Sequence, residues 1–263
     1  MLDWLAVEFR ESGWDVKRLI ALIVTSAAYR QSAAISEEKL RTDPKNILLA
    51  RGPRFRLDGE VVRDSALAAS GLLVAKLGGP PVKPYQPAGV WEGTSMVSSN
   101  TRYYKQDAGE SLYRRSLYTL WKRSAPPASM DIFDGPTREV CVVRRERTNT
   151  PMQALVTMND PQFVEAARVL AQRAMSAAGG DVDAAIDFMT VRVLARTFNA
   201  AERTIVRNAH EDFAAYYRAN APAAAQLLAV GESSADRSLP PEELAALTMV
   251  ANQIFSLDEA LNK

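Results

Sequence analysis

Glycine- and proline-rich breaks between residues 78 and 138 divide this chain into two stretches with helical patterns. The segments Gly78-Gly-Pro-Pro-Val-Lys-Pro84 and Gln86-Pro-Ala-Gly89 cannot continue a helix, because proline lacks the N–H donor and clashes with the preceding turn. Ala125-Pro-Pro127 and Asp134-Gly-Pro136 add two further breaks. Any fold of this sequence must therefore place an irregular or extended segment between two helical parts.

The first 78 residues are predicted to be helical. A helix that starts at Leu2 ends at Gly13, and Asp15 can cap a second helix over about residues 16–30. The second segment has a basic pair before an apolar stretch, as a secretion signal does, but acidic residues precede it. We therefore expect a buried helix with its apolar residues on one face, namely Val16, Leu19, Ile20, Ile23, Val24 and Ala27. A third helix is predicted over about residues 59–77.

The break region contains the clearest strand pattern. Residues 111–124 are rich in aromatic and β-favouring side chains, which predicts a strand. It can pair with residues 101–106 across the turn at 107–109. We therefore expect a mainly α fold in which a small β-ribbon or irregular insertion occupies about residues 80–140.

Helix-start signals recur in the last third. Thr150-Pro151 and Asp160-Pro161 each place a capping residue before a proline at the first helical position. Asp181 starts another helix, and Asn199 with Glu202 forms a predicted capping box. Helices are predicted over residues 161–178, 182–196, 200–220, 222–230 and 240–255. We expect one domain over residues 1–263, with helical parts at 1–78 and 144–263 around an insertion at 79–143.

Composition excludes several classes of function. The net charge of +1 gives no electrostatic case for nucleic acid or for an anionic membrane. No apolar run reaches the roughly 18 residues of a membrane span. One cysteine and one histidine exclude an intramolecular disulfide and most zinc or haem sites, so no cofactor is expected in this chain. Cys141 lies in an apolar run and is predicted to be buried, and His210 is predicted to be solvated.

Arginine is concentrated just before the middle helices. Residues 138–147 hold four arginines, two glutamates and the single cysteine. These arginines could form internal ion pairs with carboxylates, or they could form a pocket for sulfate, phosphate or uronate at a helix N-terminus. The ligand-binding candidates are Arg114, Arg115, Arg138, Arg144, Arg145, Arg147 and Asn149, with Trp91 and Trp121 as aromatic surfaces for sugar rings.

Three carboxylates near this stretch are weak catalytic candidates. Asp131, Asp134 and Glu139 could supply the two carboxyl groups that glycoside hydrolysis requires. Asp-x-x-Asp in a loop rich in glycine and proline is also ordinary turn chemistry. The spacing of a calcium loop is absent, and no metal site is expected.

Several segments, read in order, carry a family resemblance. They are Leu2-Asp-Trp-Leu-Ala6, Ile23-Val-Thr-Ser-Ala-Ala-Tyr-Arg-Gln31, Gly79-Pro-Pro81, Leu112-Tyr-Arg-Arg-Ser-Leu-Tyr118, Phe133-Asp-Gly-Pro-Thr-Arg-Glu-Val-Cys141, Arg145-Glu-Arg-Thr-Asn-Thr-Pro-Met-Gln-Ala-Leu155 and Met158-Asn-Asp-Pro-Gln-Phe-Val-Glu-Ala-Ala-Arg168. Together they resemble the planctomycete-associated domain of unknown function number 1553. The family has no established activity, so the resemblance assigns no catalytic residues.

The resemblance implies a context for this chain. The resemblance implies a protein that is typically exported, in which this domain is C-terminal and often follows a cytochrome c-like domain and another uncharacterised domain. We therefore expect a C-terminal fragment of a longer periplasmic or extracellular protein, with haem only on an upstream domain. Three functions stay open. The chain could be a non-catalytic module that packs on upstream domains and binds anionic glycan. It could be a polysaccharide-acting hydrolase-like enzyme, or a docking partner for the cytochrome domain.

Overall fold

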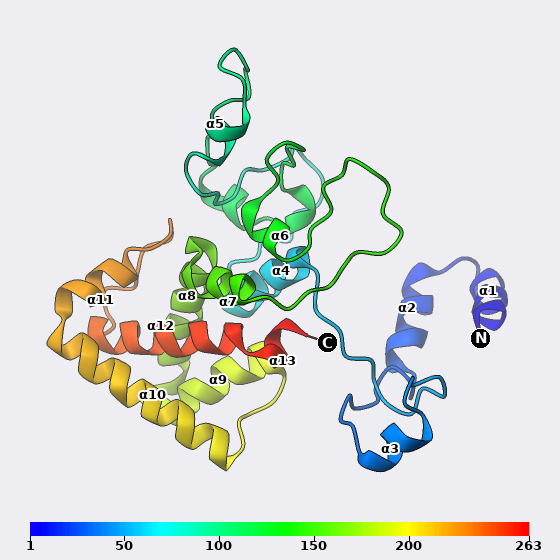
Figure 1. Cartoon of the computed structure of the whole chain (residues 1–263). Helices are drawn as coiled ribbons and strands as arrows, with labels where there is room; N and C mark the ends of the chain where they lie inside the picture. Colours follow the sequence, from blue (N-terminus) through cyan, green and yellow to red (C-terminus); the bar gives the residue numbers. More distant parts are fainter. Residues whose placement is uncertain (263) are drawn as a thin grey trace. The chain divides into compact units, whose positions relative to one another are not determined.

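The computed structural model describes residues 1–262, which form two compact units, residues 1–55 and residues 56–262 (Figure 1). The described chain is mainly α, as predicted, and its β contacts are isolated bridges rather than a sheet. No helix in the described residues is both long enough and apolar enough to cross a membrane.

The first unit contains three short helices, α1 (Leu2–Glu11), α2 (Val16–Thr25) and α3 (Glu37–Thr42). Asp15 caps α2 as predicted by accepting a hydrogen bond from the Arg18 N–H at 3.0 Å. The prediction of a buried helix over residues 16–30 is wrong. The helix ends at Thr25, none of its residues is buried, and Ile20 is 54% exposed. The short helices of this unit do not enclose the apolar face of α2.

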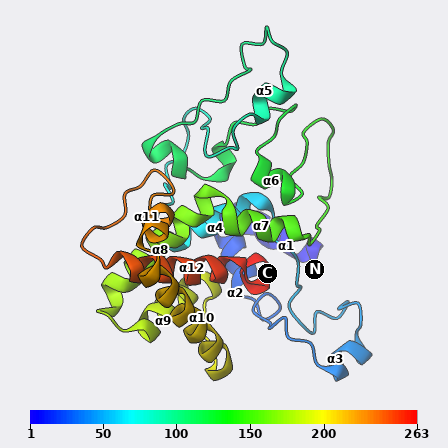
Figure 2. The ribbon, with the colours of Figure 1, turned by 60° about the vertical axis from the view of Figure 1, so that its left-hand side comes forward.

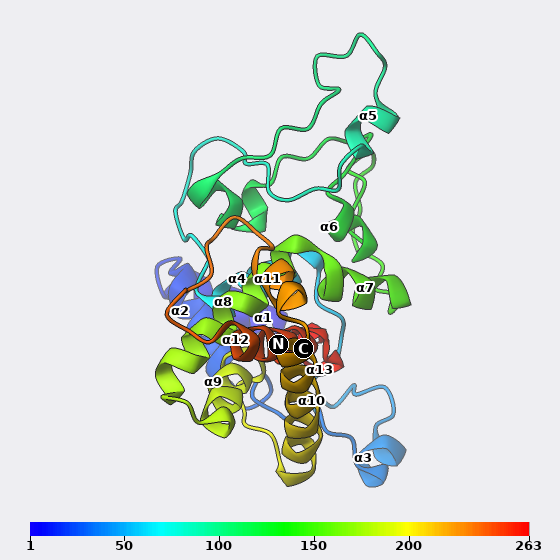
Figure 3. The same ribbon diagram turned by 90° about the vertical axis from the view of Figure 1, so that its left-hand side faces the viewer.

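The second unit is built around two central helices, α8 (Pro161–Ala178) and α12 (Pro241–Ser256). α8 packs against α12, α9 (Val182–Leu194) and α4 (Gly59–Ser70), as Figures 1 and 3 show. α12 also packs against α10 (Ala200–Ala219) and α11 (Ala221–Leu228). Two shorter helices, α7 (Pro151–Asn159) and α13 (Asp258–Leu261), flank the ends of α8 and α12.

Small side chains let α8 approach its neighbours closely. Ala166, Ala167, Leu170 and Ala174 are fully buried, and Phe163 is nearly so, which confirms the predicted inward face of this helix. The predicted core residues of α12 are buried as well, from Leu244 to Ile254. Burial of such faces, rather than helix propensity, supplies most of the stability of helices of this length.

The predicted caps explain where these helices begin. Asp160 accepts from the Gln162 N–H and starts α8, and Asp181 starts α9 by accepting from Asp183 and Ala184. Asn199 and Glu202 form the predicted capping box of α10. α4 is shorter than predicted, because Gly71 adopts φ 84° and ends it after Ser70.

The insertion lies between α4 and α7 and is irregular (Figure 2). It contains α5 (Val90–Thr94), 3₁₀ turns at Gly109–Tyr113 and Ser116–Tyr118, and α6 (Ala128–Ile132). The predicted strand over residues 111–124 is wrong. The segment includes two 3₁₀ turns, it contacts Val74 and Val82 only through isolated bridges, and side chains of α4 hold it in place. Arg63 donates to the carbonyls of Leu112 and Arg114 at 2.6 and 2.8 Å.

Candidate functional site

The arginine-rich loop before α7 is tied to the start of α4. Arg145 donates to both carboxylate oxygens of Glu60, at 2.6 and 3.0 Å, and lies 3.7 Å from Asp58. Hydrogen bonding to Glu60 raises the pKa of Arg145 above its ordinary value. The Nε of Arg147 lies 3.8 Å from Asp58 Oδ1. Two of the candidate arginines therefore face carboxylates of the protein itself.

The other arginine candidates are dispersed. Arg114 is buried, donates to the carbonyls of Lys76, Gly78 and Pro80, and stacks on the Tyr118 ring with 3.9 Å between the guanidinium carbon and the ring centroid. Arg138 stacks in the same way on Trp121 at 4.4 Å. The remaining candidates are exposed, namely Arg115, Arg144 and Asn149.

One hollow gathers part of this loop. It has a volume of about 390 Å³, and its walls include Arg138, Glu139, Cys141 and Arg145. Cys141 is exposed there, so the prediction of a buried cysteine is wrong. Val143, two residues later, is fully exposed, because the loop does not pack its apolar run against a helix.

The ion pair at Arg145 has a measurable consequence. We expect Arg145→Ala to lower the free energy of unfolding by about 1 kcal/mol, because a half-buried bidentate pair is lost and Glu60 is left without its partner. Arg144→Ala, one residue away and exposed, is the matched control and should change stability by less than about 0.5 kcal/mol. Urea denaturation measures both. Equal effects of the two substitutions would show that the ion pair between Arg145 and Glu60 does not stabilise the fold.

Two of the carboxylate and aromatic candidates, Asp134 and Trp91, stabilise loops. Asp134 accepts hydrogen bonds from the Thr148 N–H at 2.7 Å and from its hydroxyl at 2.9 Å, which joins the two ends of the arginine-rich loop. Asp131 is exposed in α6. Trp91 is 4% exposed, with Tyr104 edge-on at 4.9 Å and the Lys122 ammonium 4.6 Å from its ring centroid. Trp91 is therefore part of a small core beneath the insertion.

A buried polar cluster on α8 was not predicted. Glu165 is 1% exposed and accepts four hydrogen bonds. The hydroxyls of Tyr85 and Tyr113 donate to it at 2.9 and 2.8 Å, and the Ser233 N–H and hydroxyl donate at 2.7 and 2.6 Å. Burial and Glu165 raise the pKa of Tyr113 to about 12 and raise that of Tyr85 further, so both hydroxyls keep their protons.

Arg168, one turn along α8, completes this cluster. Its side chain is fully buried, lies 3.8 Å from Glu165, and donates to the Ser233 hydroxyl and to Gln172, each at 2.9 Å. Gly231 precedes Ser233 with φ 92°, and a Cβ there would lie 2.4 Å from the Glu165 carboxyl carbon. The cluster therefore fixes the loop between α11 and α12 and requires glycine at position 231.

Beside this cluster lies a pocket of about 480 Å³ at the start of α8. Its apolar wall includes Ile132 of α6 with Met152, Leu155 and Val156 of α7. Its polar wall consists of Tyr85, Gln86, Gln106, Ser129, Asn159 and Asp160. This size and mixed lining are typical of small-molecule sites.

Asp160 is the carboxylate in the described lining of this pocket. It has a second role as the cap of α8, accepting from the Gln162 N–H at 3.0 Å. Burial raises the pKa of Asp160 to about 6, although hydrogen bonds from Gln162 favour the charged form. A carboxyl group with such a pKa in a pocket is a frequent mark of a functional site.

The raised pKa of Asp160 makes stability depend on pH. The folded state holds the proton more tightly than an unfolded aspartate, whose pKa is about 3.9. The contribution of this group is therefore most favourable below about pH 4, and it falls by about 1–3 kcal/mol as the pH rises from 4 to above 6. Asp160→Asn keeps a good cap and should lose this dependence.

Urea denaturation from pH 4 to 7.5 tests this expectation. The variant should gain stability relative to the natural protein as the pH rises through 6. Asp181→Asn makes the same change at the exposed cap of α9 and serves as the matched control. Parallel profiles of stability against pH for the natural protein and Asp160→Asn would contradict the raised pKa of Asp160.

The only histidine also differs from its prediction. His210 is 7% exposed rather than solvated, because its Nε2 lies 2.6 Å from Glu243 Oε1 at the start of α12. That hydrogen bond lowers the pKa of Glu243, against the effect of burial. Within residues 1–262, no three or more His, Cys, Asp or Glu side chains are placed to hold a metal ion.

Comparison with known proteins gives one match. Neither a curated protein nor a solved structure matches this chain significantly. A family model described as PSD1, protein of unknown function (DUF1553), matches residues 1–210. The match includes the arginine-rich loop, the pocket residues, Glu165 and Arg168. Since it spans most of the 263 residues, the chain belongs to the DUF1553 family.

Proposed function

We propose that the pocket at the start of α8 binds an uncharged, hydroxyl-rich ligand, such as a sugar unit of a neutral polysaccharide. The protein is then a non-catalytic binding module of a longer, exported polypeptide. The observation that carries the proposal is the lining. Three amide side chains, the hydroxyl-bearing Tyr85 and Ser129, and Asp160 line one pocket of about 480 Å³ together with an apolar wall.

The chemistry of this lining favours a neutral ligand. Amides both donate and accept hydrogen bonds, and a carboxylate accepts them from sugar hydroxyls. Met152 and Leu155 offer an apolar surface to the C–H face of a ring. The described lining contains no lysine or arginine, so a sulfate or uronate would meet Asp160 with no cationic side chain in the lining to pair with. The anionic ligand considered from the sequence fits this pocket less well.

Binding is favoured over hydrolysis for a related reason. Glycoside hydrolysis uses two carboxyl groups about 5–10 Å apart on either side of the bond. Asp160 is a single carboxylate in the described lining, and Asp134 is engaged by Thr148. Asp131 and Glu139 are not among the residues that line this pocket.

Calorimetric titration with neutral and sulfated oligosaccharides tests the proposal. We expect neutral oligosaccharides to bind and sulfated ones to bind more weakly at the same concentration. Gln106→Ala and Asn159→Ala should each weaken binding several-fold, because a hydrogen bond to ligand contributes about 1 kcal/mol. Gln226→Ala, at an exposed position of α11, is the matched control. Binding of sulfated ligand alone, lost in Arg138→Ala, would move the site to the arginine-rich loop.

A further inference from the structure

A second concave surface lies between α10, α12 and α13, and it shares no lining residue with the pocket described above. It has a volume of about 580 Å³. Seven apolar residues line it, namely Met158, Phe198, Ile205, Val206, Val250, Ile254 and Leu257. We call this surface the α10–α12 groove.

The apolar side chains at the edge of the groove are unusually accessible. Ile205 is 69% exposed, Met158 47% and Leu257 37%, whereas Val250 and Ile254 form a buried floor. A contiguous apolar surface with a charged rim is typical of an interaction site. Two helices that flank such a floor can accept the apolar face of a third helix.

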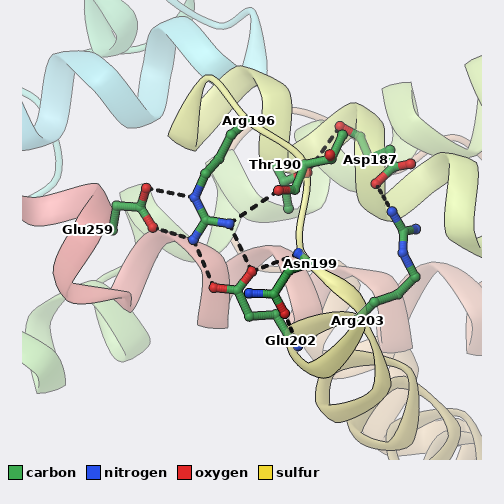
Figure 4. Close-up of polar contacts among 8 residues, drawn as sticks. Asp187, Thr190, Arg196, Asn199, Glu202, Arg203 and Glu259 are labelled. Atoms are coloured by element: carbon green, nitrogen blue, oxygen red, sulfur yellow. Dashed lines mark hydrogen bonds and ion pairs between the residues drawn. The ribbon is translucent and has the colours of Figure 1, made fainter. Parts of the chain in front are cut away.

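Arg196 forms the charged rim with two glutamates (Figure 4). It donates to Glu259 Oε1 and Oε2 at 2.8 and 2.6 Å, and to Glu202 Oε2 and Oε1 at 2.8 and 2.9 Å. A fifth hydrogen bond, at 3.1 Å, goes to the Thr197 carbonyl. All of the guanidinium's edges are therefore used within the protein.

The rim has an uncompensated negative charge. The Arg196 hydrogen bonds, with one from the Asn199 N–H, lower the pKa of Glu202 to about 2, so this carboxyl is ionised at neutral pH. One guanidinium is thus shared by two carboxylates. Glu259 is the more open of the two, with 47% of its side chain exposed, and each of its oxygens accepts one hydrogen bond from Arg196, although a carboxylate oxygen can accept two.

We propose that the α10–α12 groove binds an amphipathic helical segment of a partner protein that carries basic residues beside its apolar face. Apolar side chains of the partner cover Ile205, Met158 and Leu257, and a lysine or arginine pairs with Glu259. An acidic segment, or an amphiphile with an anionic head, would meet like charge at the same rim. This inference does not depend on the sugar-binding proposal, because the two sites share no lining residue.

Peptide binding measured by fluorescence anisotropy tests the groove. The probes are a labelled amphipathic peptide of leucine and lysine and its leucine and glutamate counterpart with the same apolar face. We expect the lysine peptide to bind at least 10-fold more tightly than the glutamate peptide. Ile205→Asn should weaken its binding about 10-fold. Val191→Asn, at an exposed apolar position of α9 outside the groove, should leave it unchanged.

Glu259→Gln separates charge from apolar contact. The amide oxygen can still accept from Arg196, so we expect a folded protein whose affinity for the lysine peptide is several-fold lower and depends less on salt. Circular dichroism of each variant checks the fold. Equal loss in Ile205→Asn and Val191→Asn, or equal affinity for both peptides, would overturn the proposal. The proposal would also be overturned if the natural protein were a dimer in solution and Ile205→Asn were a monomer, because a second copy of this chain would then occupy the groove.

Discussion

Glu165→Ala is expected to lower the free energy of unfolding by about 3–5 kcal/mol, because it removes one partner of a buried ion pair. The substitution leaves the fully buried Arg168 without a carboxylate. It also leaves the hydroxyls of Tyr85, Tyr113 and Ser233 without their acceptor. Unsatisfied buried donors add to the loss. Urea denaturation monitored by far-ultraviolet circular dichroism gives the value.

Two variants make this prediction specific. Glu165→Gln keeps an oxygen acceptor and should lose less than the alanine variant. Glu211→Ala, at an exposed position of α10, is the control and should change stability by less than about 0.5 kcal/mol. A loss below about 1 kcal/mol for Glu165→Ala would show that the cluster does not hold the loop between α11 and α12.

Arg63→Ala should have an effect of similar size, about 3–5 kcal/mol, through a different set of contacts. Arg63 is 2% exposed and donates to Gln162 Oε1 at 2.7 Å, to the Ser116 hydroxyl at 3.1 Å, and to two carbonyls of the insertion. One side chain of α4 therefore joins α8 to residues 112–116. Its removal leaves four buried acceptors without a donor.

We do not expect lysine to substitute for Arg63 in this role, because an ammonium group lacks the planar fork with which a guanidinium reaches acceptors in several directions. Arg63→Lys is expected to recover less than half of the loss. Arg123→Ala, at an exposed position of the insertion, is the control. In hydrogen exchange, the amides of residues 112–120 should lose protection in Arg63→Ala while the amides of α12 keep theirs. Uniform loss of protection would contradict a local role.

The helices of the second unit could be predicted from sequence because their signals are local. A cap at Asp160, Asp181 or Asn199 acts on N–H groups two or three residues away, and the apolar period of α8 identifies its inward face. The failed predictions depend on distant residues. Residues 111–124 have a strand composition, but Arg63, about fifty positions earlier, binds their carbonyls.

The candidate sites depend even more on long-range contacts. The sequence identifies Asp160 as a cap but not as part of a pocket. The pocket forms only when the chain brings Asp160 together with residues 85–87, 106 and 128–132. Glu165 and Arg168 fit a plain helical pattern, and their partner Ser233 lies 65 or more positions later. The arginine-rich loop was conspicuous in the sequence, but Glu60 and Asp58, which face it, are about 85 positions away.

The central claim, a neutral ligand in the pocket at the start of α8, is tested most directly by NMR of the side-chain amides during titration with a neutral oligosaccharide. The account predicts concentration-dependent shifts for Gln86, Gln106 and Asn159, which line the pocket, and none for Gln226 or Gln253. Unchanged pocket amides at millimolar oligosaccharide, or shifts confined to the arginine-rich loop around Arg138 and Arg145, would contradict it.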